Sequence, residues 1–170
     1  MRIVLGHGAS GTAASMKPHV EGLRRRGVEA LAIDLPKGRA ERAVDAYERA
    51  ASPSPQDVIG GQSYGGRVAS MLAARQPVAG LLLLSYPLHP PGKKDWEERV
   101  RHWPEIHCPV LLLSGEADPL ARMEFLQRAV GRLENAELVT YPRLGHTLKP
   151  VLEDVLDRAA AWALAMLRTE

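Results

Sequence analysis

Cysteine pairs, long apolar runs and an excess of one charge are all missing from this sequence. Cys108 is the only cysteine, so no disulfide can form within the chain, which fits a reducing compartment. The longest apolar run, residues 78–84, is far shorter than the roughly 20 residues that cross a bilayer. The opening residues MRIVLGHG have too short an apolar run for a signal peptide. We therefore expect a cytoplasmic protein that binds no membrane.

The chain also has little net charge. Its 22 basic residues nearly balance its 20 acidic residues and leave a formal charge of +2. Charges of both signs are interspersed, apart from the run Arg24-Arg25-Arg26, which is more typical of a solvated helix end than of a phosphate site. We therefore predict no nucleic-acid partner. A chain of 170 residues with 45% hydrophobic content predicts one globular domain over residues 1–170, and the pattern favours no particular oligomeric state.

Short aliphatic runs alternate along the chain with segments of helical periodicity. Six runs have strand length, and several are apolar on both faces, as buried parallel strands are: residues 2–5, 28–33, 57–59, 80–84, 110–113 and 137–141. Apolar residues with helical spacing occupy residues 16–23, 68–72, 123–133 and 151–167. This alternation predicts an α/β fold, a three-layer sandwich with a parallel sheet of about six strands. Any active site is expected at the carboxyl edge of that sheet.

The segment after the first strand, Gly6-His7-Gly8-Ala9-Ser10-Gly11, matches the G-x-G-x-x-G pattern of dinucleotide-binding folds. Asp34, at the end of the second strand, stands where such folds keep the acid that binds ribose. That interpretation needs a helix that starts inside the glycine loop. Pro18 is tolerated only in the first turn of a helix, which places the helix start near Lys17. Dinucleotide binding is therefore the less favoured interpretation.

A second glycine-rich segment, Gly61-Gln62-Ser63-Tyr64-Gly65, matches G-x-S-x-G between a strand and a helix. In that context the serine occupies a strained turn, and the glycines on either side let the strand and the helix cross closely. A serine that only caps the helix would explain Ser63, but it would not explain both glycines. The pattern therefore predicts that Ser63 is a nucleophile.

A serine hydroxyl is a weak nucleophile unless a base takes its proton. His146 lies between the last strand and the last helix, at the expected edge, although it could also be an ordinary polar loop residue. Asp118 follows the fifth strand and would orient His146, although aspartate before proline is also a good helix N-cap; Glu116 is the alternative acid. The chain order Ser63, Asp118, His146 is that of α/β-hydrolase triads.

Acyl transfer also requires hydrogen-bond donors for the oxyanion. The backbone N–H groups of Tyr64 and of Ala9, in the loop after the first strand, are predicted as those donors. Tyr86, Leu88 and His89 follow the fourth strand and are expected to form walls of the substrate site.

The motifs HGASG, GGQSYGG, SGEAD and LGH, in this order over nearly the whole chain, resemble the α/β-hydrolase superfamily. More narrowly, GGQSYGGRVAS followed by LLLLSYPLHPPGK resembles small dienelactone-hydrolase-like proteins. The resemblance implies a minimal α/β-hydrolase fold that starts at the strand carrying HGASG, has no lid domain and leaves the cleft open. Dienelactone hydrolases use a cysteine nucleophile, whereas this sequence has Ser63 at that position.

The sequence thus predicts a serine hydrolase that cleaves a small carboxylic ester or thioester through an acyl-enzyme on Ser63. Its partner would be a small-molecule acyl substrate, and the chemistry requires no cofactor and no metal. Two alternatives stay open. One is a non-catalytic interaction module that keeps the fold, since a fold does not guarantee an activity. The other is the dinucleotide-binding protein considered above.

Overall fold

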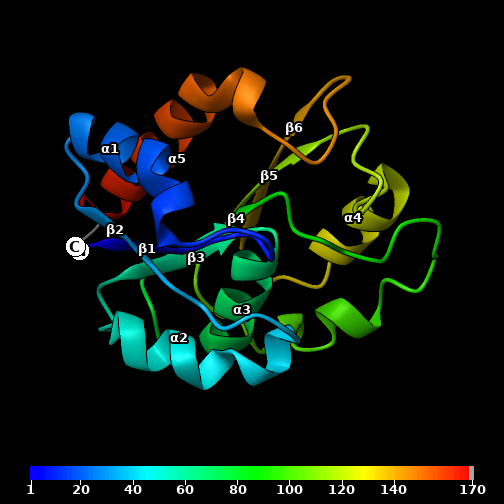
Figure 1. Cartoon of the computed structure of the whole chain (residues 1–170), viewed down its shortest axis with the longest axis horizontal. Coiled ribbons are helices and arrows are strands. Elements are labelled where there is room, and N and C mark those ends of the chain that lie inside the picture. Colours follow the sequence, from blue (N-terminus) through cyan, green and yellow to red (C-terminus); the bar gives the residue numbers. More distant parts are fainter. Residues whose placement is uncertain (169–170) are drawn as a thin grey trace.

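The structure, a computed structural model, describes residues 1–168, and its strands form one six-stranded sheet (Figure 1). The strand order is β2-β1-β3-β4-β5-β6, and every neighbouring pair is parallel. The strands are β1 (Ile3–Gly6), β2 (Ala30–Ile33), β3 (Val58–Gln62), β4 (Gly80–Leu84), β5 (Val110–Gly115) and β6 (Ala136–Tyr141). The predicted parallel sheet is confirmed.

Helices cover both faces of the sheet. On one face lie α1 (Lys17–Arg25) and α5 (Leu152–Met166); on the other lie α2 (Val44–Ala51), α3 (Tyr64–Ala73) and α4 (Met123–Val130) (Figure 1). Side chains alternate along each strand, so Val4 packs on the α2–α3–α4 side while Ile3 and Leu5 pack on the α1–α5 side. Strands that are apolar on both faces therefore sit between two helical layers, which confirms the three-layer α/β sandwich.

Two features differ from the sequence prediction. Helix α2 lies where no helix is predicted; it has only eight residues, and it buries Val44 and Tyr47 against the core. Between β4 and β5 the strict alternation of strand and helix is wrong, because that connection contains only the 3-10 turns Glu98–Val100 and Trp103–Glu105. Its prolines cannot donate backbone hydrogen bonds, which disfavours a longer helix there.

The loop after β1 does not have the geometry of a dinucleotide site. Helix α1 begins at Lys17, as Pro18 predicts, and a 3-10 turn at Ala13–Met16 precedes it. The carboxylate of Asp34 accepts a hydrogen bond from the backbone N–H of Ala13 at 2.8 Å. This aspartate therefore holds the start of the turn. Within residues 1–168, no helix is long and apolar enough to span a membrane.

Candidate active site

Ser63 lies on a sharp turn between β3 and α3. Its φ of 49° and ψ of −116° are unusual for a residue with a side chain and mark a strained backbone. Although Ser63 occupies the N-cap position of α3, its side chain makes no capping hydrogen bond. The hydroxyl is therefore available to another partner, and Ser63 does not serve as a helix cap through its side chain.

Gly61 and Gly65 permit this turn because they let α3 approach β1 and β3 closely. A Cβ at Gly65 would lie 2.4 Å from the carbonyl carbon of Gly6 and 2.5 Å from its oxygen. A Cβ at Gly61 would lie 2.6 Å from the same oxygen. These neighbours are backbone atoms, so no side-chain rotation can relieve the overlap. The close crossing requires glycine at both positions, as the G-x-S-x-G pattern predicts.

Ser63, His146 and Asp118 meet at the carboxyl edge of the sheet. The Nε2 atom of His146 lies 2.9 Å from the Oγ of Ser63, and its Nδ1 lies 2.7 Å from Oδ2 of Asp118. The Asp118 side chain is fully buried, while 32% of the His146 side chain is exposed. The imidazole therefore faces the solvent side of the edge, and its carboxylate partner is shielded from water.

The two carboxylate oxygens of Asp118 have separate partners. Oδ1 accepts a hydrogen bond from the backbone N–H of Leu120 at 2.8 Å, while Oδ2 faces His146. Helix α4 begins only at Met123, so Asp118 is not its N-cap. The side chain of Glu116 instead accepts a hydrogen bond from the hydroxyl of Thr140 at 2.9 Å. The structure thus pairs His146 with Asp118 and not with the alternative acid.

Contacts between two loops hold His146 opposite Asp118. The backbone N–H of Ala117 donates to the carbonyl oxygen of Leu144 at 2.8 Å. A Cβ at Gly115 would lie 2.2 Å from that same oxygen, so the loop after β6 passes directly over the end of β5. Because both loops are fixed at this crossing, the histidine and the aspartate are positioned before any substrate binds.

The loop after β1 is anchored by His7, which is buried. Its Nε2 accepts a hydrogen bond from the backbone N–H of Leu35 at 2.9 Å, and its Nδ1 lies 2.7 Å from the carbonyl oxygen of Gly8. Nδ1 therefore carries the proton, since a carbonyl can only accept. Ala9 and Tyr64, the predicted oxyanion donors, both border a depression beside Ser63, and the Tyr64 hydroxyl donates to the carbonyl of Pro36.

This depression has a volume of about 520 Å³. Pro87, Pro90 and Pro91 form one wall of it. The neighbouring side chains predicted as walls, Tyr86, Leu88 and His89, are instead buried, each no more than 2% exposed. As a correction to the sequence prediction, the loop after β4 borders the depression through its prolines, whereas the three predicted residues are buried and do not line it.

Two of the buried residues fasten this loop to its surroundings. The hydroxyl of Tyr86 donates to the carbonyl oxygen of Arg99 at 2.6 Å, and its ring packs edge-on against Trp103 at a centroid distance of 5.0 Å. The Nε2 atom of His89 accepts from the backbone N–H of Arg122 at 3.2 Å. These contacts make the proline wall a fixed rim.

Sequence reasoning missed three arginines that line the same depression, Arg39, Arg67 and Arg99. Arg67 has a local signal, because it lies one helical turn after Ser63 and thus on the same face of α3. Arg99 and Arg39 come from irregular segments, where no periodicity indicates which side chains turn toward the site.

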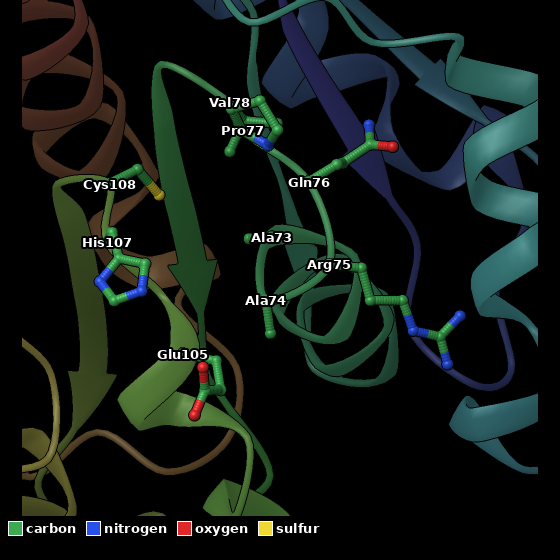
Figure 2. Close-up of a pocket in the computed structure, with 9 residues that line it drawn as sticks. All are labelled: Ala73, Ala74, Arg75, Gln76, Pro77, Val78, Glu105, His107 and Cys108. Atoms are coloured by element: carbon green, nitrogen blue, oxygen red, sulfur yellow. The ribbon is translucent and has the colours of Figure 1, made fainter.

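A second hollow, of about 470 Å³, lies at the opposite edge of the sheet (Figure 2). It is lined by the end of α3, the segment that leads into β4, and residues just before β5, including Cys108. Burial raises the pKa of the Cys108 thiol to about 11, so the thiol remains protonated near neutral pH. This hollow contains no member of the Ser63–His146–Asp118 group.

A parallel sheet in this order, with a serine on a tight strand-to-helix turn and a Ser–His–Asp chain of contacts, is the arrangement of the α/β-hydrolase class. The chain belongs to this family: a family model described as "Alpha/beta hydrolase domain" matches residues 36–169. The resemblance drawn from the sequence motifs is thereby confirmed.

Among curated proteins, the chain is similar to acyl-protein thioesterase 1 of Mycosarcoma maydis, with 34% identity over 118 residues. That match covers 64% of this chain and 47% of the relative, so it spans about half of the relative's length.

Two solved structures share the fold. The monoacylglycerol lipase of Paleococcus ferrophilus has a TM-score of 0.80 and 16% identity, over 96% of this chain and 94% of that one. The dienelactone hydrolase of Anabaena variabilis has a TM-score of 0.76 and 22% identity, over 97% and 86% of the two chains.

Proposed function

We propose that this protein is a serine hydrolase that cleaves a small carboxylic ester or thioester through an acyl-enzyme on Ser63. One observation carries the proposal: Asp118, His146 and Ser63 form an unbroken chain of contacts of 2.7 and 2.9 Å that ends at a serine on a strained turn beside an open depression. The similarity to a thioesterase of Mycosarcoma maydis supports the substrate class.

In this mechanism His146 Nε2 takes the proton of Ser63 as its oxygen attacks the acyl carbon. The C–O or C–S bond to the leaving group then breaks, and His146 returns the proton to that group. In the second half, water attacks the acyl carbon while His146 takes its proton. The bond between the acyl carbon and the Ser63 oxygen then breaks, His146 returns the proton to that oxygen, and the carboxylic acid leaves. Asp118 holds the imidazole in the tautomer that presents a bare Nε2 to the serine. The Ala9 and Tyr64 N–H groups stabilise the oxyanion in both halves.

We further propose that residues 1–170 act as one domain without a lid. The support is the fixed proline rim of the depression, which has hydrogen-bonded and packed neighbours on its inner side. A substrate would then reach Ser63 without a closing motion.

A fluorophosphonate probe tests the serine assignment, because only an activated serine reacts with it. We expect wild type to be labelled and to hydrolyse p-nitrophenyl acetate, and Ser63→Ala to do neither while unfolding at the same temperature. Ser85→Ala is a matched control, since Ser85 also has a positive φ, 51°, just after a strand, whereas the hydrogen bond of His146 Nε2 goes to Ser63. A folded wild type that neither reacts with the probe nor turns over esters would favour the non-catalytic alternative.

A further inference from the structure

The depression beside Ser63 has a charged wall that the acyl-transfer steps do not use. Arg39, Arg67 and Arg99 line it, and we call these three residues the basic wall. They come from three separate segments: the connection after β2, helix α3 and the connection between β4 and β5. Glu41 is the one acidic residue in the same lining. Three positive charges against one negative charge therefore face the space next to the nucleophile.

Arg67 is only partly neutralised by the protein. Its Nη2 lies 2.8 Å from Oε1 of Glu41, but the Arg67 side chain is 14% exposed and the Glu41 side chain is 58% exposed. The Nε of Arg67 is buried and has no hydrogen-bond partner. The Glu41 carboxylate is thus mostly in solvent, whereas the Arg67 guanidinium is largely buried. Water and salt screen the attraction of such an exposed carboxylate, so the positive charge of Arg67 is only partly offset.

The positive charge of Arg99 is offset even less by neighbouring carboxylates. Among the residues that the structure describes, its guanidinium pairs with no carboxylate, and its Nη1 donates to the carbonyl oxygen of Pro87 at 3.0 Å. Burial, together with the nearby charge of Arg67, lowers the pKa of Arg99. Two like charges that repel each other in a half-buried wall destabilise the protein, and an anion bound between them would relieve that repulsion.

We propose that the basic wall binds an oxyanion carried by the substrate, so that the preferred ester or thioester has a carboxylate or phosphate group near the scissile carbonyl. Guanidinium groups suit both anions, because their planar N–H groups donate two parallel hydrogen bonds. The inference rests on the proposed function, since it takes Ser63 as the point of attack and assigns the neighbouring wall to recognition.

Matched ester pairs test the charge preference. Mono-p-nitrophenyl succinate is compared with p-nitrophenyl butyrate for an anion on the acyl side, and 4-acetoxybenzoate with phenyl acetate for an anion on the alcohol side. We expect wild type to prefer the charged ester in at least one pair, and added salt to reduce the preference. Inhibition of neutral-ester hydrolysis by inorganic phosphate and by succinate then shows which oxyanion the wall prefers.

Four variants locate the preference. In Arg99→Gln the ratio of kcat/KM for charged over neutral ester should fall about ten- to a hundredfold, the range for loss of a charge-assisted hydrogen bond. Arg99→Lys keeps the charge and should retain part of the ratio. Glu41→Gln removes the competing carboxylate and should raise it. Arg101→Gln is the control, because that arginine has a 77% exposed side chain and does not line the depression.

The outcomes separate the two proposals. Equal use of charged and neutral esters, or equal ratios in Arg99→Gln and Arg101→Gln, would overturn the basic wall while leaving Ser63 as the nucleophile. If no ester is hydrolysed and the fluorophosphonate probe does not react, the proposed function fails. In that case, calorimetric titration of succinate and of inorganic phosphate into folded wild type and folded Arg99→Gln still tests anion binding by the basic wall. Equal affinity for the two proteins, or no binding to either, would exclude it.

Discussion

Adding a single methyl group at Gly65 should both destabilise this protein and displace its candidate nucleophile. The new Cβ would lie 2.4, 2.5 and 2.7 Å from backbone atoms of Gly6 and His7. Ordinary carbon contacts are about 3.5–4.0 Å, so α3 and β1 must separate by about 1 Å. None of these neighbours is a side chain that could rotate away, so the main chain itself has to move.

Two effects of opposite sign set the size of the loss. Overpacking a tight core costs about 1–3 kcal/mol, occasionally more, and a clash with backbone on three sides belongs at the upper end. Alanine in place of glycine within a helix contributes up to about 1 kcal/mol in the other direction. The net destabilisation is then about 2 kcal/mol, or a fall in Tm of about 4–8 °C for a chain of this size. A shift of about 1 Å next to the reacting atoms should also lower kcat about a hundredfold.

Gly66→Ala is the matched control for Gly65→Ala. It offers the same helix propensity gain, but its Cβ would come no nearer than 3.0 Å to any neighbour, the Gly61 carbonyl oxygen, with a flexible Leu83 methyl at 3.4 Å and the Gly61 carbonyl carbon at 3.6 Å. Thermal unfolding followed by circular dichroism gives both Tm values, and turnover of p-nitrophenyl acetate per folded molecule gives both rates. A Gly65→Ala protein as stable and active as Gly66→Ala would refute the close crossing of α3 and β1.

Three more predictions follow from the site and its supports. Asp118→Asn should lower kcat about 10⁴-fold, because an amide can hold the wrong tautomer of His146, yet leave Tm nearly unchanged, since its oxygen can still accept from Leu120; a large Tm loss with full activity would point to a structural role. Burial disfavours the charge of Asp57, but hydrogen bonds from Arg2 and Ser54 outweigh burial and lower its pKa. As the pH falls, the unfolded chain therefore takes up the proton first, and the free energy of unfolding of wild type should decrease below about pH 4. In Asp57→Asn the free energy of unfolding at pH 7 should be lower by about 2–4 kcal/mol, and denaturant titrations should show a smaller decrease at acidic pH. For p-nitrophenyl esters, kcat/KM should peak at short acyl chains and decline by octanoyl, because each CH₂ contributes about 0.8 kcal/mol only where a wall covers it; a profile that still rises there would reveal an apolar channel.

Local patterns were enough to predict the sheet and the Ser63–His146–Asp118 group. A strand buried on both faces needs an unbroken aliphatic run, and the carboxyl ends of parallel strands share one edge, so residues 63, 118 and 146 were expected there. The two glycines around Ser63 indicated the strained turn for the same local reason. The sequence does not indicate helix α2, because Val44 and Tyr47 are its only large apolar side chains and two positions do not define a helical period. Its burial depends on tertiary contacts such as that of the Tyr47 hydroxyl with the carbonyl oxygen of Gly60 at 2.7 Å.

Tertiary structure alone decided which side chains form the walls of the site. In a strand or helix the period sets the direction of each side chain, but the connection after β4 has no period. There Trp96 and Trp103 are buried in the core, Tyr86 packs edge-on against Trp103, and the prolines and Arg99 line the depression. The basic wall arises in the same way. Its three arginines are distant in sequence, and only the packing of two irregular connections against α3 brings them together beside Ser63.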